Sequence, residues 1–327
     1  MKNEILRRLS ALALGLALLL NAAPLPQAFA VEDDTDASSS DSADSTDTAD
    51  KTAVTTADSD PTVTAAAANA PALDATAALL VSPESDMVLY EKNADEKRYP
   101  ASTTKIMTAL LTLENVSDLS AVVTAEASDF ENVTADSSNA GIKLGEQVTV
   151  KDLLYALMLP SANEAAYMLA RHVGGSWEQF VDMMNERAAE LGCTGTHFCN
   201  PCGLHEDDHY TTAHDLYRIA KQAMKDATFR DIVSTVQHRM AKTNLHEERI
   251  ILTTNQLIFS SFQPWSYANC LGIKTGHTSQ AGNCFVGYAE YGDAKLFSVV
   301  LGCSSSSKEY PTVAASFTDT KSLCQWG

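Results

Sequence analysis

A serine and a lysine three residues apart open the first apolar helix that the sequence predicts. Ser102 and Lys105 belong to the stretch Pro100-Ala-Ser-Thr-Thr-Lys105, and the run 106–111 that follows is apolar almost throughout. Because residues three apart share a helix face, the Lys105 amine can reach the Ser102 hydroxyl. Burial against the apolar run favours the neutral amine, which can accept the serine proton. The spacing therefore predicts a serine nucleophile with a lysine base.

This pair alone is a weak signal. A Ser-x-x-Lys string is expected by chance about once in a chain of this length. Ser305 and Lys308 form a second copy, which no apolar helix follows. For Ser102 taken by itself, the simpler interpretation is a helix-start serine with a solvated lysine one turn later. The case for chemistry therefore depends on motifs elsewhere in the chain.

The second motif is a serine and an asparagine that directly follow a predicted helix. The apolar run 153–159 predicts a helix that Pro160 ends, and Ser161-Ala-Asn163 comes next. A competing Ser137-Ser-Asn139 lies in a polar loop, where no helix end presents it. We therefore assign Ser161 and Asn163 as the second pair of candidate site residues.

The third motif, Lys274-Thr-Gly276, lies in a segment with the pattern of a strand. Lys274 and Thr275 offer a cation and a hydroxyl to a carboxylate, and Gly276 leaves room for a substrate against the backbone. Taken alone, the tripeptide is equally a turn at a strand end. Its place after the other two motifs argues against coincidence, because penicillin-binding proteins and class A β-lactamases share this set of three.

Strand patterns at both ends of the chain enclose a helical middle, which predicts an α+β fold. Two short apolar runs at 77–81 and 87–90 indicate an N-terminal hairpin that delivers the chain to Ser102. The turns between the late strands contain glycine, which suits an antiparallel sheet. The other expected elements are helices after the capping residues Thr149, Ser176 and Thr212, strands at 270–276, 284–289 and 295–301, and a final helix at 312–325.

The first thirty residues predict a secretory signal peptide. Lys2, Arg7 and Arg8 precede an apolar run at 9–20, and Ala28-Phe-Ala30 offers small residues at the cleavage position. We therefore expect secretion, with the mature protein outside the cytoplasm. The apolar run is too short for a comfortable membrane span, so we expect no integral span in the mature chain.

Residues 31–75 predict a disordered acidic linker rich in Ser, Thr and Asp. Residues 31–60 hold ten acids and one lysine, and so carry −9 of the formal net charge of −19. A spacer that holds the enzyme off a surface and a passive leader both fit this composition. The acidity argues against nucleic acid as a partner. Residues 76–327 are then expected to form the catalytic domain.

Seven cysteines in a secreted chain invite disulfides, and the odd number leaves at least one thiol free. Cys199-Asn-Pro-Cys202 has the spacing of a redox or zinc pair, but neither a second such pair nor a βαβ pattern accompanies it. We interpret His205-Glu-Asp-Asp-His209 as a solvated loop rather than a metal cluster. The sequence therefore predicts neither a metal site nor a cofactor.

Together these motifs resemble the serine-type D-alanyl-D-alanine carboxypeptidases, the low-molecular-weight penicillin-binding proteins. The resemblance extends over residues 77–326. It implies a β-lactamase/DD-peptidase-like fold, with an antiparallel sheet flanked by helices and a helical subdomain. It also implies roles in peptidoglycan biosynthesis and cell shape. Besides the three motifs, it rests on Tyr99-Pro-Ala-Ser-Thr-Thr-Lys105, Met184-Asn-Glu-Arg187, Asn200-Pro-Cys-Gly-Leu204 and Tyr210-Thr-Thr-Ala213.

The resemblance implies acyl transfer on peptidoglycan stem peptides, with release of the terminal D-alanine. Ser102 would attack the penultimate D-alanine carbonyl, and Lys105 would take its proton. The backbone N–H groups of Ser102 and His277 would form the oxyanion hole. Ser161 would relay a proton to the leaving amine. Penicillin, which mimics the D-alanyl-D-alanine end, would acylate Ser102 and leave slowly.

The same resemblance implies how the substrate is held. Asn163 would bond the substrate amide and Thr275 the terminal carboxylate, while Lys274 would hold the local charge beside Gly276. Ala162 stands where glycine is frequent in relatives. Relatives also commonly continue into a small β-rich domain and an amphipathic anchor helix, beyond the point where this chain ends at Gly327.

Three alternatives stay open. A D,D-endopeptidase of the same family would cut crosslinks, and sequence alone separates it poorly. A class A-like β-lactamase needs a glutamate that activates the deacylating water, and no convincing Glu-x-x-Leu-Asn stretch follows Ser161. An inactive peptidoglycan-binding protein is disfavoured by the intact motifs. We expect a secreted, extracytoplasmic protein, at the cell wall or the outer face of the membrane.

Overall fold

The computed structural model describes residues 69–134, 137–259 and 263–327 of the chain. They belong to one unit, which runs from Ser59 to Gly327. The predicted signal peptide at 1–30 and residues 31–68 of the predicted linker lie outside the described residues.

The centre of this unit is a five-stranded antiparallel sheet. Its strands are β1 (Ala77–Ser82), β2 (Met87–Lys92), β7 (Cys270–Thr278), β8 (Gly282–Tyr291) and β9 (Ala294–Cys303). Their order across the sheet is β2-β1-β9-β8-β7. The N-terminal hairpin joins the C-terminal meander because β1 pairs with β9, which places Leu79 opposite Val299. The predicted α+β fold is confirmed.

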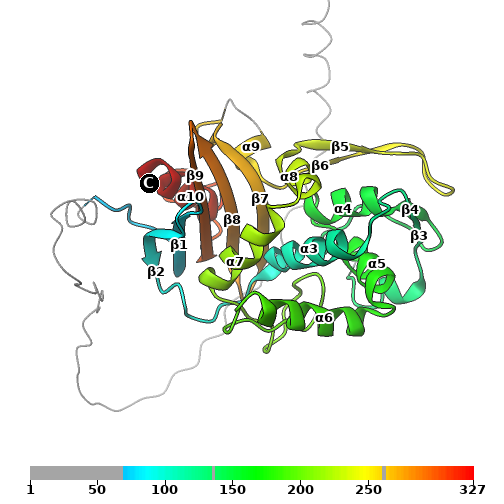
Figure 1. Cartoon of the computed structure of the whole chain (residues 1–327). Helices are drawn as coiled ribbons and strands as arrows, with labels where there is room; N and C mark the ends of the chain where they lie inside the picture. The colour runs from blue at the N-terminus through cyan, green and yellow to red at the C-terminus, as the bar shows by residue number, and fades with distance from the viewer. Residues whose placement is uncertain (1–68, 135–136, 260–262) are drawn as a thin grey trace, which may run out of the picture. The chain divides into compact units, whose positions relative to one another are not determined.

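The two faces of the sheet are covered by different helices. These are α3 (Lys105–Asn115), α7 (Ala213–Ala223) and α10 (Ala315–Trp326). Successive strand residues point to opposite faces, so Leu80 packs with Leu323 of α10. Leu79 belongs instead to the larger core that includes α3 and α7. Figure 1 shows α7 and α10 on opposite sides of the sheet.

A helical subdomain inserted between β2 and β7 completes the unit (Figure 1). The predicted caps are confirmed, because the hydroxyls of Thr149, Ser176 and Thr212 each accept the backbone N–H three residues later. The subdomain comprises α4 (Val150–Met158), α5 (Asn163–Gly174), α6 (Trp177–Glu190), α8 (Ala227–Ser234), and two ribbons, β3 (Val122–Thr124) with β4 (Gln147–Thr149) and β5 (Gln237–Met240) with β6 (Arg249–Leu252). The short helix α9 (Gln256–Phe259) packs instead on the sheet, where Leu257 belongs to the same core as Leu323 of α10.

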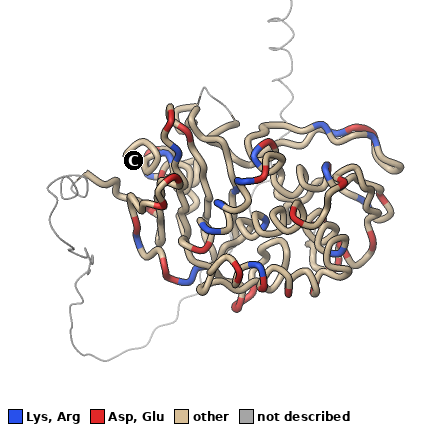
Figure 2. The backbone as a smooth tube through the Cα atoms, in the orientation of Figure 1, with Lys and Arg blue, Asp and Glu red and all other residues tan. Residues whose placement is uncertain are grey.

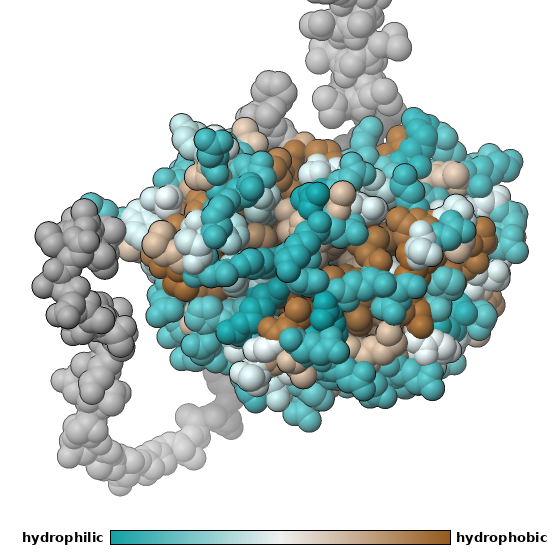
Figure 3. Space-filling view, viewed as in Figure 1, coloured by the Kyte–Doolittle hydropathy of each residue, from teal (hydrophilic) through white to brown (hydrophobic). Residues whose placement is uncertain are grey.

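The surface mixes both signs of charge with scattered apolar side chains. Figure 2 shows Lys and Arg interspersed with Asp and Glu along the β5–β6 ribbon. Figure 3 shows apolar patches between hydrophilic residues on the same view. Ile250 and Leu252 of β6 are among the exposed large hydrophobic residues. Across the described ranges, every helix is too short or too polar to span a bilayer.

The expectation of disulfides is wrong, because all seven cysteines are free thiols. Six of them are buried and fill the core as small apolar side chains. The two thiols of Cys199-Asn-Pro-Cys202 have different neighbours, His197 Nδ1 at 3.7 Å for Cys199 and Asn200 Oδ1 at 3.4 Å for Cys202. Close spacing in the sequence does not pair them.

Candidate active site

Ser102 lies in a short 3-10 turn that leads into α3. The turn spans Ala101–Thr104, and the α-helix begins at Lys105. Ala101 enters the turn with φ +47°, a left-handed conformation that is unusual for a residue with a side chain. Lys105 Nζ donates to Ser102 Oγ at 2.9 Å, as the three-residue spacing predicted. The tighter turn replaces the first turn of the expected helix and leaves Ser102 half-buried.

The Lys105 side chain is fully buried and has three oxygen acceptors. Besides Ser102 Oγ, its Nζ donates to Asn163 Oδ1 at 2.8 Å and to the Cys202 carbonyl at 2.7 Å. Burial penalises the ammonium and lowers the pKa of Lys105 to about 8, although nearby negative charge at Glu164 opposes that shift. The neutral amine is therefore accessible near neutral pH, as a base for Ser102 must be.

Ser161 offers a buried hydroxyl to the space in front of Ser102. It occupies the connection from α4 to α5 with φ +68°, a conformation costly for a serine. The residue is 4% exposed, and its Oγ has no hydrogen-bond partner among the described residues. A buried polar atom without a partner is rare in native proteins and is a candidate contact for a ligand.

The Lys-Thr-Gly motif lies on β7, an edge strand of the sheet. Burial lowers the pKa of Lys274 well below its usual range, and the Lys105 charge lowers it further. Lys274 Nζ donates to the Thr275 carbonyl at 3.1 Å. Thr275 Oγ1 also lies 2.6 Å from Thr254 Oγ1.

Gly276 brings β7 against the nucleophile turn. A Cβ added at Gly276 would lie 2.9 Å from the Pro100 carbonyl oxygen and 3.1 Å from Ser102 N. Glycine at this position therefore makes room for the turn that carries Ser102, as well as leaving the strand edge open. His277, the next residue, is exposed at the rim of the cleft.

These motifs converge on one cleft of about 440 Å³ between β7 and the helical subdomain. Ser137 and Ser138 of the rejected second motif line it too, although Asn163 is the residue that contacts Lys105. Thr254 and Gln256 also line the cleft, and no sequence pattern singled them out. Two of the eight predicted site residues, Lys105 and Lys274, are buried behind the wall of the cleft. The other six line the cleft: Ser102, Ser161, Asn163, Thr275, Gly276 and His277.

The interpretation of 205–209 as a solvated loop is wrong at its last residue. Residues 206–208 are exposed, but His209 is only 2% exposed. Its Nδ1 accepts the Cys199 N–H at 3.1 Å, so Nε2 carries the proton and donates to Thr104 Oγ1 at 2.8 Å. Burial lowers the pKa of His209 to about 3, which keeps it neutral. The polar residues around His209 in the sequence did not indicate that its side chain is buried or that it bonds Thr104.

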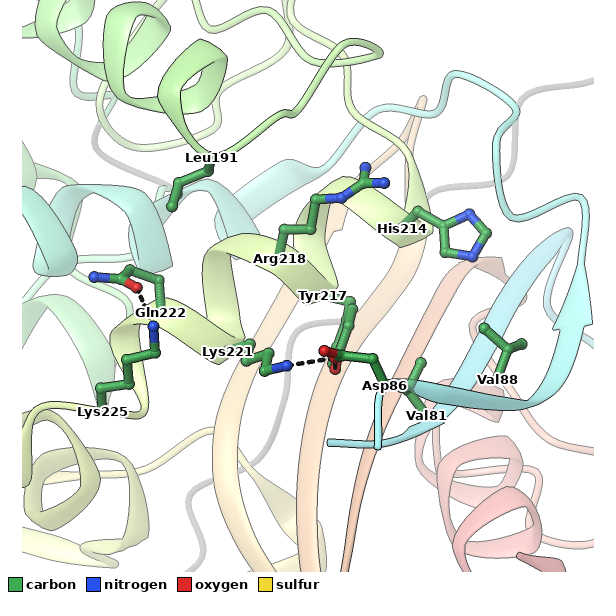
Figure 4. Close-up of a pocket in the computed structure, with 10 residues that line it drawn as sticks. All are labelled: Val81, Asp86, Val88, Leu191, His214, Tyr217, Arg218, Lys221, Gln222 and Lys225. Atoms are coloured by element: carbon green, nitrogen blue, oxygen red, sulfur yellow. Dashed lines mark hydrogen bonds and ion pairs between the residues drawn. The ribbon is translucent and has the colours of Figure 1, made fainter. Parts of the chain in front are cut away.

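A second hollow of about 500 Å³ lies beside α7 and the β1–β2 turn (Figure 4). His214, Arg218, Lys221 and Lys225 lie at helical spacing along its wall. Three of these basic side chains already pair with carboxylates: His214 with Asp95, Arg218 with Asp215, and Lys221 with Asp86. The only hydroxyl among the residues that line this hollow is that of Tyr217, which donates to the Asp86 carboxylate.

A serine hydrogen-bonded to a buried lysine, between the edge of an antiparallel sheet and a helical subdomain, defines the class of penicillin-recognising serine enzymes. Residues 64–305 match the peptidase S11 family, described as D-alanyl-D-alanine carboxypeptidase. The chain belongs to this family.

Curated relatives and solved structures agree with this assignment. D-alanyl-D-alanine carboxypeptidase DacF of Bacillus subtilis is 34% identical over 233 residues, which cover 71% of this chain and 58% of that protein. The D-alanyl-D-alanine carboxypeptidase of Streptomyces sp. K15 is 36% identical over 230 residues, 66% of this chain and 77% of that protein. The crystal structure of the Streptomyces K15 DD-transpeptidase superposes with a TM-score of 0.70 at 33% identity, and covers 79% of this chain and 98% of that one.

Proposed function

We propose that this chain is a serine D-alanyl-D-alanine carboxypeptidase, which removes the terminal D-alanine of peptidoglycan stem peptides through an acyl-enzyme. The observation that carries the proposal is the 2.9 Å hydrogen bond from the buried Lys105 amine to Ser102 Oγ. The chain spans 58% of the length of DacF, so the activity comes to it by analogy with its relatives and from this geometry.

In acylation, Ser102 Oγ forms a bond to the penultimate D-alanine carbonyl carbon while Lys105 Nζ takes the hydroxyl proton. The backbone N–H groups of Ser102 and His277 hold the oxyanion. The C–N bond then breaks, and the terminal D-alanine leaves with a proton delivered through Ser161. The unpartnered Ser161 hydroxyl in the cleft supports this role.

The substrate carboxylate belongs beside Lys274 and Thr275. The paired hydroxyls of Thr275 and Thr254 offer it hydrogen bonds at the strand edge. A carboxylate there favours the charged form of Lys274, and a positive Lys274 in turn favours the neutral base at Lys105. Asn163, which bonds Lys105, lies where it can hold the substrate amide.

Water completes the cycle by hydrolysing the acyl-enzyme. Among the described residues that line the cleft, none carries a carboxylate that could activate this water as a β-lactamase glutamate does. We therefore propose that penicillin acylates Ser102 and is released slowly, which makes β-lactams inhibitors of this enzyme rather than substrates.

The deciding experiment combines fluorescent-penicillin labelling with D-alanine release from a peptide that ends in Lys-D-Ala-D-Ala. We expect stable labelling and D-alanine release, both abolished by Ser102→Ala. Ser305→Ala, in the second Ser-x-x-Lys copy, is the matched control and should change neither. Label retained in Ser102→Ala would refute the assignment of the nucleophile.

The remaining outcomes of this experiment separate the alternatives. Rapid loss of label with hydrolysed penicillin and no D-alanine would identify a β-lactamase. Cleavage of a crosslinked stem-peptide dimer in preference to the monomer would identify an endopeptidase. Absence of labelling would indicate an inactive peptidoglycan-binding protein.

We further propose that residues 1–30 direct secretion, that 31–75 form the spacer, and that 76–327 act at the cell wall or the outer face of the membrane. The charged start, apolar run and small residues before Val31 support this order. N-terminal sequencing of the exported protein should find Val31 first. An uncleaved N-terminus would refute the signal peptide.

A further inference from the structure

Glu164 is a buried carboxylate beside the candidate active site, and the acyl-transfer chemistry does not use it. It follows Asn163 in the first turn of α5 and is only 1% exposed. Burial raises the pKa of its carboxyl group, whereas backbone N–H donors and the Lys105 charge lower it. A charge-bearing group is seldom buried this deeply unless its contacts compensate the cost.

The side-chain hydrogen bonds of Glu164 are all made by Oε1, to the segment 137–142 that contributes Ser137 and Ser138 to the cleft wall, while Oε2 has no hydrogen-bond partner among the described residues. Glu164 Oε1 accepts the Ala140 N–H at 2.7 Å and the Ile142 N–H at 3.4 Å. The Asn163 N–H donates to the Ser138 carbonyl at 2.9 Å. The first two residues of α5 therefore make three bonds to the backbone of this segment.

The segment contributes two serine side chains to the cleft. Ser137 and Ser138 line the cleft, while Ile142 is buried in the core behind them. The same turn of α5 presents Asn163 Oδ1 to Lys105. One helix start thus fixes the cleft wall and the base together, with Glu164 bonded to the wall and Asn163 to the base.

We propose that Glu164 is a positioning residue for substrate binding, which holds the segment 137–142 in place as the wall against which the acyl-donor part of the peptide lies. This inference rests on the proposed carboxypeptidase function for its kinetic part. Its structural part, the bonds from Ala140 and Ile142 to Glu164, is independent of that function.

Three variants of the full chain test the proposal. Glu164→Ala removes the acceptor, and Glu164→Asp keeps the charge on a side chain too short to reach both N–H groups. Glu164→Gln keeps a carbonyl oxygen in place of Oε1. We expect Glu164→Ala and Glu164→Asp to raise KM for a peptide ending in Lys-D-Ala-D-Ala about tenfold, with kcat changed much less, and Glu164→Gln to restore most of the loss.

Amide hydrogen exchange of the peptic fragment that covers 137–142 gives a readout that needs no activity. Exchange at Ala140 and Ile142 should accelerate at least about tenfold in Glu164→Ala and Glu164→Asp, and much less in Glu164→Gln. The matched control is Glu146→Gln. That buried carboxylate accepts the Lys143 N–H at 3.0 Å and faces Arg249 at 2.8 Å, so its loss should lower stability without changing KM or exchange in 137–142.

The outcomes are distinct. A wild-type protein without D-alanine release would refute the proposed function, and the exchange data would still test the contacts of Glu164. Unchanged exchange and unchanged KM in folded Glu164→Asp would overturn this inference. If kcat and stability fall together in the Glu164 variants while KM stays unchanged, Glu164 has only a general structural role. That result would also overturn the inference.

Discussion

In the proposed mechanism, Lys105 sets the pH at which Ser102 can react. Its ammonium cannot accept the serine proton, and burial lowers its pKa to about 8. The rate constant for acylation by a fluorescent penicillin should therefore fall about tenfold per pH unit below that value and level off above it. Measurement from pH 6 to 9.5 tests this. A rate independent of pH would exclude Lys105 as the base.

Ser161 is a residue at which activity and stability should separate. Its φ of +68° and its unpartnered buried hydroxyl both cost stability in the free protein. Ser161→Ala removes that hydroxyl, so thermal stability should stay within about 1 kcal/mol of the wild type or rise. D-alanine release should fall by about a hundredfold or more, because the proposed proton relay is lost. Full activity in a stable variant would contradict the relay.

The sequence predicts the contacts of some site residues and not those of others. The contact of Ser102 with Lys105 follows from helical spacing and needed no further information. Asn163 and Lys274 were singled out by their motifs, but only the resemblance predicted that they lie near Lys105, because nothing in local spacing brings α5 or β7 to it. His209 was missed for the same reason. Its partner, Thr104, is more than a hundred residues away, and a polar stretch around a histidine favours a loop prediction.

At the level of elements, His209 fixes the start of α3 through Thr104 and stays neutral while buried. Its pKa falls from 6.5 to about 3 on folding, so between these values the unfolded chain binds a proton that the folded chain does not. This contribution to stability is complete above pH 6.5 and is lost as the pH falls, at about 1.4 kcal/mol per unit.

Comparing His209→Gln with the wild type isolates that contribution, since the carboxylates common to both proteins cancel. The variant should be less stable at pH 7.5, and its stability should fall less steeply between pH 6.5 and 4.5. Urea unfolding at each pH measures both slopes. Parallel slopes would show that His209 is charged in the folded protein or accessible to water.

The predicted and missed elements differ in their apolar pattern. The five strands of the central sheet and the capped helices carried clear patterns, and the structure contains each of them. The β3–β4 and β5–β6 ribbons were missed because their strands are only three or four residues long, too short for an alternation of apolar and polar residues to emerge. Packing on the helical subdomain and side chains such as Asn244, which bonds Gln147 N at 2.8 Å, hold them in place.

For the whole molecule, the topology followed from the order of the patterns, since strands at both chain ends close one sheet. The disulfide expectation failed because compartment and cysteine number say nothing about geometry. Six of the seven cysteines are buried as free thiols, and each packs in the core as an alanine or valine side chain would. Stability must then come from the packed core and not from crosslinks.

Thiol reactivity tests this description of the core. Only Cys199 is partly exposed, and burial raises its pKa to about 11, so even this thiol should react slowly with a disulfide reagent at pH 8. All seven thiols should react once guanidinium unfolds the chain. A reducing agent should leave the melting temperature unchanged, because it has no bond to break. A lowered melting temperature, or fewer than seven reactive thiols after unfolding, would reveal a disulfide and contradict the free-thiol core.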